Sequence, residues 1–216
     1  MLQLSHGACH PSCVTRRFDA DYRETATLRD GSTVELRPVR PDDKPIFLDG
    51  FARLSPESRY LRFFTGKEHL SAEELRYLTE VDGEKHFAIG AIRPDGVGAG
   101  VARFIRLDDE PEVAELAVTV VDEMQRKGLG RILLERLVEA ARERGVTHFR
   151  AEVLASNTAM LALLEGQVAT KTLEGGAVQV DFQVPAAAPA GGLTSLLELA
   201  AKRLLSFRRV FDRQPS

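Results

Sequence analysis

One stretch, from Val118 to Glu143, constrains the fold of this chain more than any other. An apolar, β-branched run leads into a short basic turn that contains Gly128 and Gly130, and an amphipathic helical pattern follows directly. A strand that feeds a glycine turn and then a helix forms an anion cradle. The first backbone N–H groups of the helix have no partner, and the helix dipole adds partial positive charge. We therefore expect a phosphate-bearing ligand at this turn.

The residue types in the turn suit a phosphate. Gly128 and Gly130 have no Cβ, so a phosphate can approach the backbone closely. Further donors and positive charge come from Gln125, Arg126, Lys127 and Arg131. The turn is not a Walker loop, because no Gly-Lys-Ser/Thr follows, and it lacks the third glycine of the dinucleotide fingerprint. The alternative interpretation is a glycine-containing connection that binds no ligand.

Length and composition favour one globular domain with extensions. The chain has 216 residues, of which 44% are hydrophobic and 28% charged. Its net charge of −3 gives no overall reason to expect nucleic acid. No apolar run reaches the ~18 residues that cross a bilayer, no secretory signal precedes the domain, and two cysteines do not make a disulfide framework. We therefore expect a cytoplasmic protein.

The N-terminal residues 1–25 lack clear periodicity, and we expect them to form a flexible leader, or one that is held only by packing. Four potential soft ligands lie close together in it, namely His6, Cys9, His10 and Cys13. A zinc site is the alternative interpretation, but the spacing is tight for one tetrahedral ion and no second knuckle supports it. We predict no metal.

The C-terminal part of the chain separates from the domain through an Ala/Pro/Gly linker over residues 186–192. Residues 193–216 contain an amphipathic helix and a tail. The long apolar stripe of that helix needs a partner. We expect it to pack on its own domain or on a second subunit in a homodimer, and an acidic membrane surface is the alternative.

Residues 26–185 carry the alternation of strands and helices of an α/β (α+β) domain. Asp30-Gly31 marks the turn of a first hairpin, and Ser55 and Ser71 are N-capping residues that open helices. The other elements that we expect are a helix over 43–54, strands over 86–92, 98–107 and 111–121, a helix over 127–144 that ends at Gly145, a strand over 148–154, a short helix over 157–164 and a hairpin over 173–184.

This order resembles the fold of the GNAT acetyltransferases, and Gln125-x-x-Gly128-x-Gly130 resembles their acetyl-CoA pyrophosphate loop. The stretches Leu36–Asp43, Leu54–Phe64 and Ala114–Val118 resemble the acetyltransferase domain of the Pat-type bacterial protein lysine acetyltransferases. The resemblance implies a central mixed, mostly antiparallel sheet, flanked by helices and splayed apart at the acetyl-CoA site. In that group the domain often sits beside a nucleotide-sensing or acyl-CoA-synthetase-like domain, for which we expect no room here.

The same resemblance implies the transfer of an acetyl group from acetyl-CoA to a primary amine, most often a protein lysine, by direct attack in a ternary complex. The pyrophosphate would bind the backbone N–H groups from Arg126 to Arg131, including that of Leu129. The pantetheine arm would pair like an additional strand with the edge near Val118, Thr119 and Val120, whose N–H groups would stabilise the thioester oxygen. Asn157 matches the position that hydrogen-bonds this arm, and a plain helix cap is its alternative role.

Glu115 is the candidate general base, because an ammonium group must lose a proton before it can attack. It lies ten residues before Gln125 and interrupts the apolar stretch from Val113 to Val118, where an unpaired charge without a role would be costly. The Pat-type pattern carries its presumed base at this position. The alternative is a solvent-facing or ion-paired strand residue.

One departure from the family concerns the general acid. Many GNAT enzymes have a tyrosine shortly after the position of Asn157, but the tyrosines of this chain are Tyr22, Tyr60 and Tyr77. Without a tyrosine at that position, the CoA thiolate would leave unaided or with the help of water. His86, Arg59 and Arg62 are candidates for residues of the acceptor site. Alternatively, their side chains are packed or solvated and have no part in it.

Two further functions stay open besides protein lysine acetylation. One is the acetylation of a small-molecule amine, and the other is a non-catalytic acyl-CoA sensor that acts through the C-terminal helix. A pure interaction module with a vacant loop would have no affinity for CoA.

Overall fold

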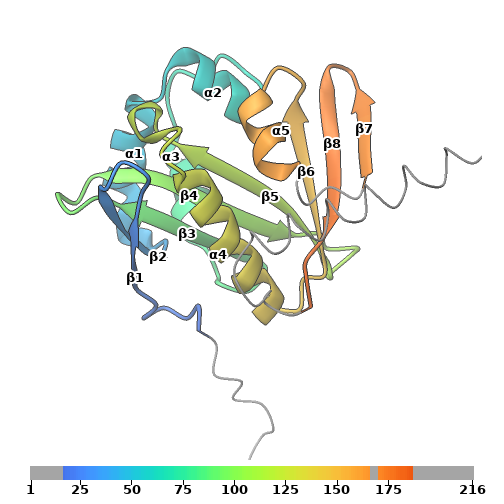
Figure 1. Ribbon diagram of the computed structural model, residues 1–216, viewed down its shortest axis with the longest axis horizontal. Helices are drawn as coiled ribbons and strands as arrows, with labels where there is room; N and C mark the ends of the chain where they lie inside the picture. Colours follow the sequence, from blue (N-terminus) through green and yellow to red (C-terminus); the bar gives the residue numbers. More distant parts are fainter. Residues whose placement is uncertain (1–16, 166–169, 187–216) are drawn as a thin grey trace, which may run out of the picture.

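In the computed structural model, residues 17–165 and 170–186 are described, and they form one eight-stranded sheet with helices on both faces (Figure 1). The strands are β1 (Glu24–Thr27), β2 (Thr33–Pro38), β3 (His86–Ile92), β4 (Gly98–Arg106), β5 (Val113–Val120), β6 (His148–Leu154), β7 (Thr170–Glu174) and β8 (Ala177–Gln183). The helices are α1 (Lys44–Ala52), α2 (Pro56–Phe63), α3 (Ala72–Thr79), α4 (Leu129–Glu143) and α5 (Thr158–Leu164).

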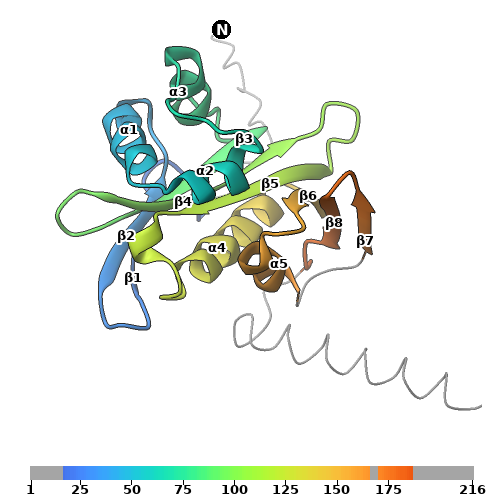
Figure 2. The same ribbon diagram turned by 90° about the horizontal axis from the view of Figure 1, so that it is seen from above.

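The strand order is β1-β2-β3-β4-β5-β6-β8-β7. Every pair of neighbours is antiparallel except β5 and β6, which run parallel. Helices α1, α2 and α3 lie on one face, while α4 and α5 lie on the other (Figure 2). The expected mixed, mostly antiparallel sheet flanked by helices is confirmed.

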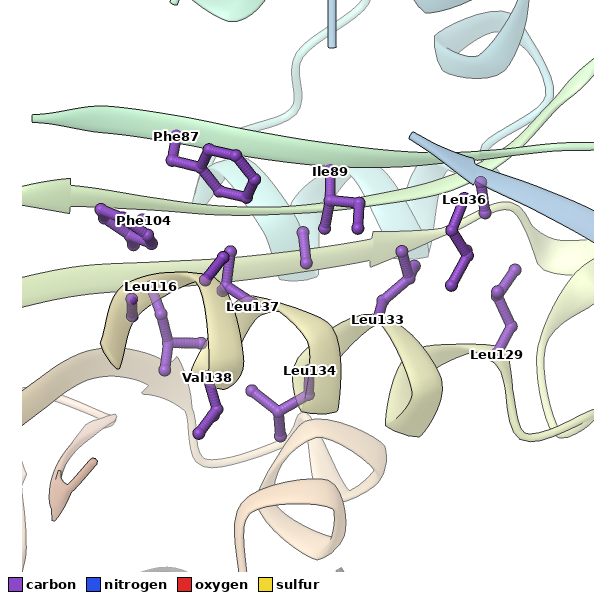
Figure 3. Packing of buried hydrophobic residues seen from close by; sticks show 14 of the residues in the cluster. Leu36, Phe87, Ile89, Phe104, Leu116, Leu129, Leu133, Leu134, Leu137 and Val138 are labelled. Atoms are coloured by element: carbon purple, nitrogen blue, oxygen red, sulfur yellow. The ribbon is translucent and has the colours of Figure 1, made fainter. Parts of the chain in front are cut away.

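The core lies between α4 and the sheet. One stripe of α4 is almost fully excluded from solvent, and Leu133 and Leu137 point from it toward the strands (Figure 3). They meet Leu36, Ile89 and Phe104 from three different strands. Each such fully buried side chain contributes about 1.5–3 kcal/mol through its removal from water, so α4 and the central strands form a rigid base for the rest of the domain.

The sheet divides between β5 and β6. These strands pair only over Val113–Glu115 with His148–Arg150 and then separate, although β5 continues to Val120. Within the described residues, no other strand pairs with the freed edge of β5. The expected splay is therefore present.

A row of aromatic rings holds the closed end of this division together. Phe87, Phe104, Phe149 and Phe182 come from β3, β4, β6 and β8, and successive ring centroids lie 5.7, 6.1 and 5.5 Å apart. The row crosses from one half of the sheet to the other, and tilted or offset aromatic pairs of this kind add to the burial energy. The two halves are thus joined through packing as well as through backbone hydrogen bonds.

The local signals for turns and helix starts are confirmed. Gly31 has a φ of 82°, which suits the tight turn of the first hairpin. The Ser55 hydroxyl accepts a hydrogen bond from the Ser58 N–H at 3.1 Å, and Ser71 and Glu74 form a reciprocal capping box. Gly145, with a φ of 76°, follows the end of α4 as expected.

The leader is shorter than the sequence predicts. Phe18 is 1% exposed and Tyr22 is 7% exposed. The Phe18 N–H donates to the Glu143 carboxylate of α4 at 3.1 Å. Residues 17–25 are therefore a packed part of the domain, because two aromatic rings are buried there.

The remaining predictions for the ends of the chain lie outside the described residues. These are the zinc alternative at residues 6–13 and the helix over 193–216, together with almost all of the linker. In the part that the structure describes, no helix combines the length and the apolarity that a bilayer crossing needs.

Candidate active site

A cavity of about 1020 Å³ occupies the division between β5 and β6. Gly130 and Leu134 of α4 line it on one face of the sheet, and Arg62 of α2 and Tyr77 of α3 line it on the other. Because residues from both faces line one continuous space, two molecules can meet in it from opposite sides of the sheet.

The anion cradle lies at one end of this cavity. Helix α4 begins at Leu129, two residues later than predicted, because Arg126 and Gly128 are left-handed with φ values of 60° and 90°. Ile132 is the first residue of the helix whose N–H finds a backbone carbonyl, that of Gly128 at 3.2 Å. The N–H groups of the preceding turn are therefore available to a ligand, as the geometry of a helix N-terminus requires.

Gln125 fastens the cradle to the strand before it. Its Nε2 donates to the Val120 carbonyl at 3.1 Å and to the Ser58 hydroxyl at 3.3 Å. Asp122 accepts hydrogen bonds from the Ser55 and Ser58 hydroxyls at 2.7 and 2.9 Å. Burial raises the pKa of the Asp122 carboxyl, but these hydrogen bonds outweigh it and the pKa is lowered. The cradle and the start of α2 thus form one hydrogen-bonded unit.

The first hairpin supplies a cavity residue that the sequence does not indicate. The Arg29 N–H donates to the Lys127 carbonyl at 3.0 Å, and the Lys127 ammonium lies 2.9 Å from the Asp30 carboxylate. The Arg29 side chain lines the cavity and passes directly over Gly128, where a Cβ would lie 3.4 Å from it. No local sequence pattern predicts this contact, because the hairpin and the cradle are about a hundred residues apart in sequence.

Most of the predicted donor-binding residues line the cavity, namely Val118, Thr119, Val120, Gln125, Arg126, Gly128, Gly130, Arg131 and Asn157. The side chains of two others do not. Lys127 is paired with Asp30, and Leu129 is 1% exposed and packs in the core. Only their backbone groups are available for the role that the sequence suggested.

Asn157 caps α5 and still has a free donor. Its Oδ1 accepts from the Met160 N–H at 3.1 Å. The side-chain NH₂ has no hydrogen bond within the described residues, and Asn157 lines the cavity opposite the freed edge of β5. The capping role is therefore shown, and it leaves the amide NH₂ available for a ligand.

Glu115 lies at the point where the two strands separate. It pairs with Ile105 of β4 and, as the last residue in register with β6, with Arg150. Its side chain is exposed and lines the cavity, whereas its neighbours Ala114 and Leu116 are buried. In the described part of the chain its carboxylate has no hydrogen bond or ion pair, so no partner there supports the ion-paired alternative. The exposed side chain fits both a solvent-facing strand residue and a group that interacts with a substrate.

The three candidates for the acceptor site, Arg59, His86 and Arg62, differ in their surroundings. The Arg59 guanidinium donates to the Ala52 carbonyl at 3.2 Å and lies 4.5 Å from the Phe51 ring centroid, which is a packing role. His86 is packed beside Arg103, and burial lowers its pKa to about 4, with a further contribution from the Arg103 charge. Arg62, in contrast, lines the cavity.

Comparison with known proteins identifies the fold. A family model for the acetyltransferase (GNAT) family matches residues 51–167, which include the splayed strand, the cradle and α5. The chain belongs to the GNAT acetyltransferase family. Members of this family take the acetyl group from acetyl-CoA, which is therefore the co-substrate of this GNAT domain.

Two curated relatives are similar over most of the domain. The chain is 35% identical to acetyltransferase Pat of Mycolicibacterium smegmatis over 166 residues, which cover 73% of this chain and 48% of that protein. It is 31% identical to an acetyltransferase of Pseudomonas aeruginosa over 137 residues, which cover 62% of this chain and 73% of the relative. The chain thus spans about half the length of the Pat protein.

A solved structure gives the same result. The GNAT domain of S. lividans PAT superposes with a TM-score of 0.72 at 30% sequence identity. The match covers 77% of this chain and 99% of that domain. The resemblance to a Pat-type GNAT domain is therefore confirmed.

Proposed function

We propose that this GNAT domain transfers the acetyl group of acetyl-CoA to the side chain of a protein lysine. The similarity to Pat supports a protein acceptor. The observation that carries the proposal is the position of Glu115, an unpaired carboxylate on the wall of a cavity that is open to both faces of the sheet. A cationic lysine reaches this carboxylate from the face that carries α2 and α3.

The donor binds along the freed edge of β5. The pyrophosphate lies on the N–H groups at the start of α4, beside Arg126 and Arg131, and Arg29 adds a further positive charge. The pantetheine arm runs along Val118–Val120 and accepts a hydrogen bond from the Asn157 NH₂. In this position the thioester lies near Ala117 and Val118, which follow Glu115 along β5.

Glu115 accepts the proton of the lysine ammonium, directly or through a water molecule. The neutral amine then attacks the thioester carbon, the new C–N bond replaces the C–S bond, CoA leaves as its thiolate, and the nitrogen releases its second proton to water as the amide forms. A thiol with a pKa of about 8.5 can leave without a general acid. This agrees with the absence of any tyrosine in α5, since the described tyrosine on the cavity wall is Tyr77 of α3.

The first experiment combines titration calorimetry with acetyl-CoA and a thiol-release assay with lysine peptides. Glu115→Gln keeps the size of the side chain and removes the base, so kcat falls by about 10²–10⁴-fold while the dissociation constant for acetyl-CoA stays unchanged. Glu152→Gln is the matched control, because it removes another exposed carboxylate on the cavity wall.

Each alternative outcome has a distinct meaning. Full turnover by Glu115→Gln would show that another group is the base. Binding of acetyl-CoA without release of CoA to any lysine peptide would favour the acyl-CoA sensor or a small-molecule acceptor. Failure to bind acetyl-CoA would contradict the assignment of the cradle.

A further inference from the structure

Two arginines face the acceptor side of the cavity and have no carboxylate partner among the described residues. Arg103 of β4 is only 3% exposed, and its guanidinium contacts two neutral groups, the Leu78 carbonyl at 3.1 Å and the His86 Nε2 at 3.0 Å. Arg62 of α2 has no hydrogen bond or ion pair within the described residues, and its guanidinium carbon lies 5.2 Å from the centroid of the Phe63 ring. Both arginines line the same cavity as Glu115.

The charge of Arg62 disfavours the charged form of Arg103. Burial lowers the pKa of Arg103 to about 9, and the charge of Arg62 is the next contribution to that decrease. Burial also lowers the pKa of Arg62. No carboxylate raises the pKa of either group.

Two other partly buried arginines of this domain have carboxylate partners. Arg37 contacts Asp43 at 2.6 Å, and Arg136 contacts Glu24 at 2.7 Å. A carboxylate compensates a buried charge in this way, since an unpaired buried charge is expensive. Arg62 and Arg103 have no such carboxylate among the described residues, and a bound anion would supply the missing charge.

The position of the pair shows which substrate carries that anion. Arg103 stands opposite Ala117 on β5, next to Glu115 on the same face of the sheet. The phosphate cradle begins beyond Val120, about 10 Å further along the strand at ~3.3 Å per residue. The phosphates of CoA are held at that far end, so the group that reaches Arg62 and Arg103 belongs to the acceptor.

We propose that Arg62 and Arg103 form a carboxylate subsite for the acceptor, so that the enzyme prefers a lysine with an aspartate or glutamate close to it. This inference rests on the proposed lysine acetylation. Guanidinium groups bind carboxylates with charge-assisted and often bidentate hydrogen bonds. The acceptor therefore offers opposite charges to the two parts of the site, its ammonium to Glu115 and its carboxylate to the arginines.

The test uses two peptides that differ only in a glutamate or glutamine beside the target lysine. The wild-type enzyme is expected to show a kcat/KM about tenfold higher for the glutamate peptide, which corresponds to ~1.4 kcal/mol. Arg62→Gln is expected to bring this ratio to about one by lowering kcat/KM for the glutamate peptide about tenfold, with the affinity for acetyl-CoA unchanged. The matched control is Arg76→Gln, an exposed arginine of α3 that is not among the lining residues.

Equal kcat/KM values for the two peptides in the wild type, or a preference that survives in Arg62→Gln, would overturn the subsite. Free lysine and lysine amide form a second pair, which tests a small acceptor that carries its own carboxylate. A preference for free lysine that Arg62→Gln abolishes, without a preference among the peptides, would keep the subsite and replace the protein acceptor by an amino acid.

A binding measurement separates the failure of the subsite from the failure of the proposed reaction. If acetyl-CoA binds but no lysine is acetylated, the proposed function fails. Fluorescence anisotropy with the acetyl-lysine forms of both peptides then decides the subsite without turnover. Tighter binding of the glutamate form by the wild type, lost in Arg62→Gln, supports it, and equal dissociation constants contradict it.

Discussion

At the scale of single residues, the cavity wall contains charged residues from strands that are otherwise apolar. Glu115 stands between buried Ala114 and Leu116, and Arg103 stands between buried Ala102 and Phe104. Both charged side chains line the cavity. Successive residues of a strand point to opposite faces of the sheet. The apolar neighbours are therefore buried on the face that carries α4, while the charged side chains face the acceptor side.

Gly128 and Gly130 of the cradle differ in backbone conformation. Gly128 has a φ of 90°, so it provides a backbone conformation that other residues adopt only at a cost of about 1–2 kcal/mol. Gly130 lies in the first turn of α4 with ordinary helical geometry. A Cβ at Gly130 would lie 3.6 Å from Leu163 and 3.8 Å from Val120, which is ordinary contact.

Gly130→Ala should therefore separate stability from binding. Alanine is the better helix former, so the free energy of unfolding should stay equal or rise by about 0.5 kcal/mol. The new methyl group occupies the space above the backbone where the pyrophosphate binds, so the dissociation constant for acetyl-CoA should rise by about tenfold or more. Urea unfolding and calorimetric titration measure the two effects, and unchanged affinity would place the phosphates elsewhere.

At the scale of elements, one carboxylate fastens the edge strand β1 to α4. Glu24 accepts two hydrogen bonds from the Arg136 guanidinium, at 2.8 and 2.7 Å, and one from the Tyr22 hydroxyl. Arg17 lies 3.1 Å from the same carboxylate. The hydrogen bonds from Arg136, opposed by burial and assisted by Tyr22, lower the pKa of Glu24 from 4.5 to about 2.

This depressed pKa predicts the pH dependence of stability. Because the folded-state pKa lies below the unfolded value, the contribution of Glu24 is complete above pH 4.5 and is lost as the pH falls toward 2. Glu24→Gln should thus lower the free energy of unfolding by about 1–3 kcal/mol at pH 7. The difference from the wild type should shrink steadily below pH 4.5.

Urea unfolding at several pH values checks this prediction. Glu80→Gln is the control, because the Lys44–Glu80 pair is well exposed and should contribute about 0.5 kcal/mol or less. A constant difference between Glu24→Gln and the wild type from pH 7 to pH 2 would show that the ionised carboxylate is not the source of the stability.

For the whole molecule, a donor bound in the division of the sheet, as proposed, would stabilise the arrangement of the two halves. Strands β1–β5 and β6–β8 are joined by three parallel residue pairs and by the row of phenylalanines. A ligand that lies along β5 and contacts Asn157 at the start of α5 bridges the open end between the halves. Binding therefore couples two parts of the sheet that otherwise meet only at one end.

Acetyl-CoA should accordingly stabilise both halves. At a free concentration 100 times its dissociation constant, mass action adds about 2.7 kcal/mol to the free energy of unfolding. Hydrogen exchange of backbone amides should slow at Val118–Val120, at the start of α4 and also in β6. Slowing confined to the cradle, with β6 unaffected, would show that the ligand does not bridge the halves.

The sequence by itself determines the local structure and predicts the donor site. The capping residues Ser55 and Ser71, the turn glycine Gly31 and the stripe of α4 act through neighbours in the chain, and the structure confirms each of them. The cradle is also local, because a strand, a glycine turn and a helix N-terminus are consecutive. Glu115 is detectable as a charge in an apolar strand, although the sequence alone leaves open whether it is ion-paired.

Only the tertiary structure decides which distant residues share the cavity. Arg29 reaches Gly128 from a hairpin, and Arg62 of α2 and Arg103 of β4 line one cavity, close enough for the charge of Arg62 to affect Arg103. The packed aromatic rings of Phe18 and Tyr22, where a flexible leader was expected, have the same origin. Such contacts depend on strand register and helix packing, which are set by the burial of the whole core. No pattern within a single segment encodes them.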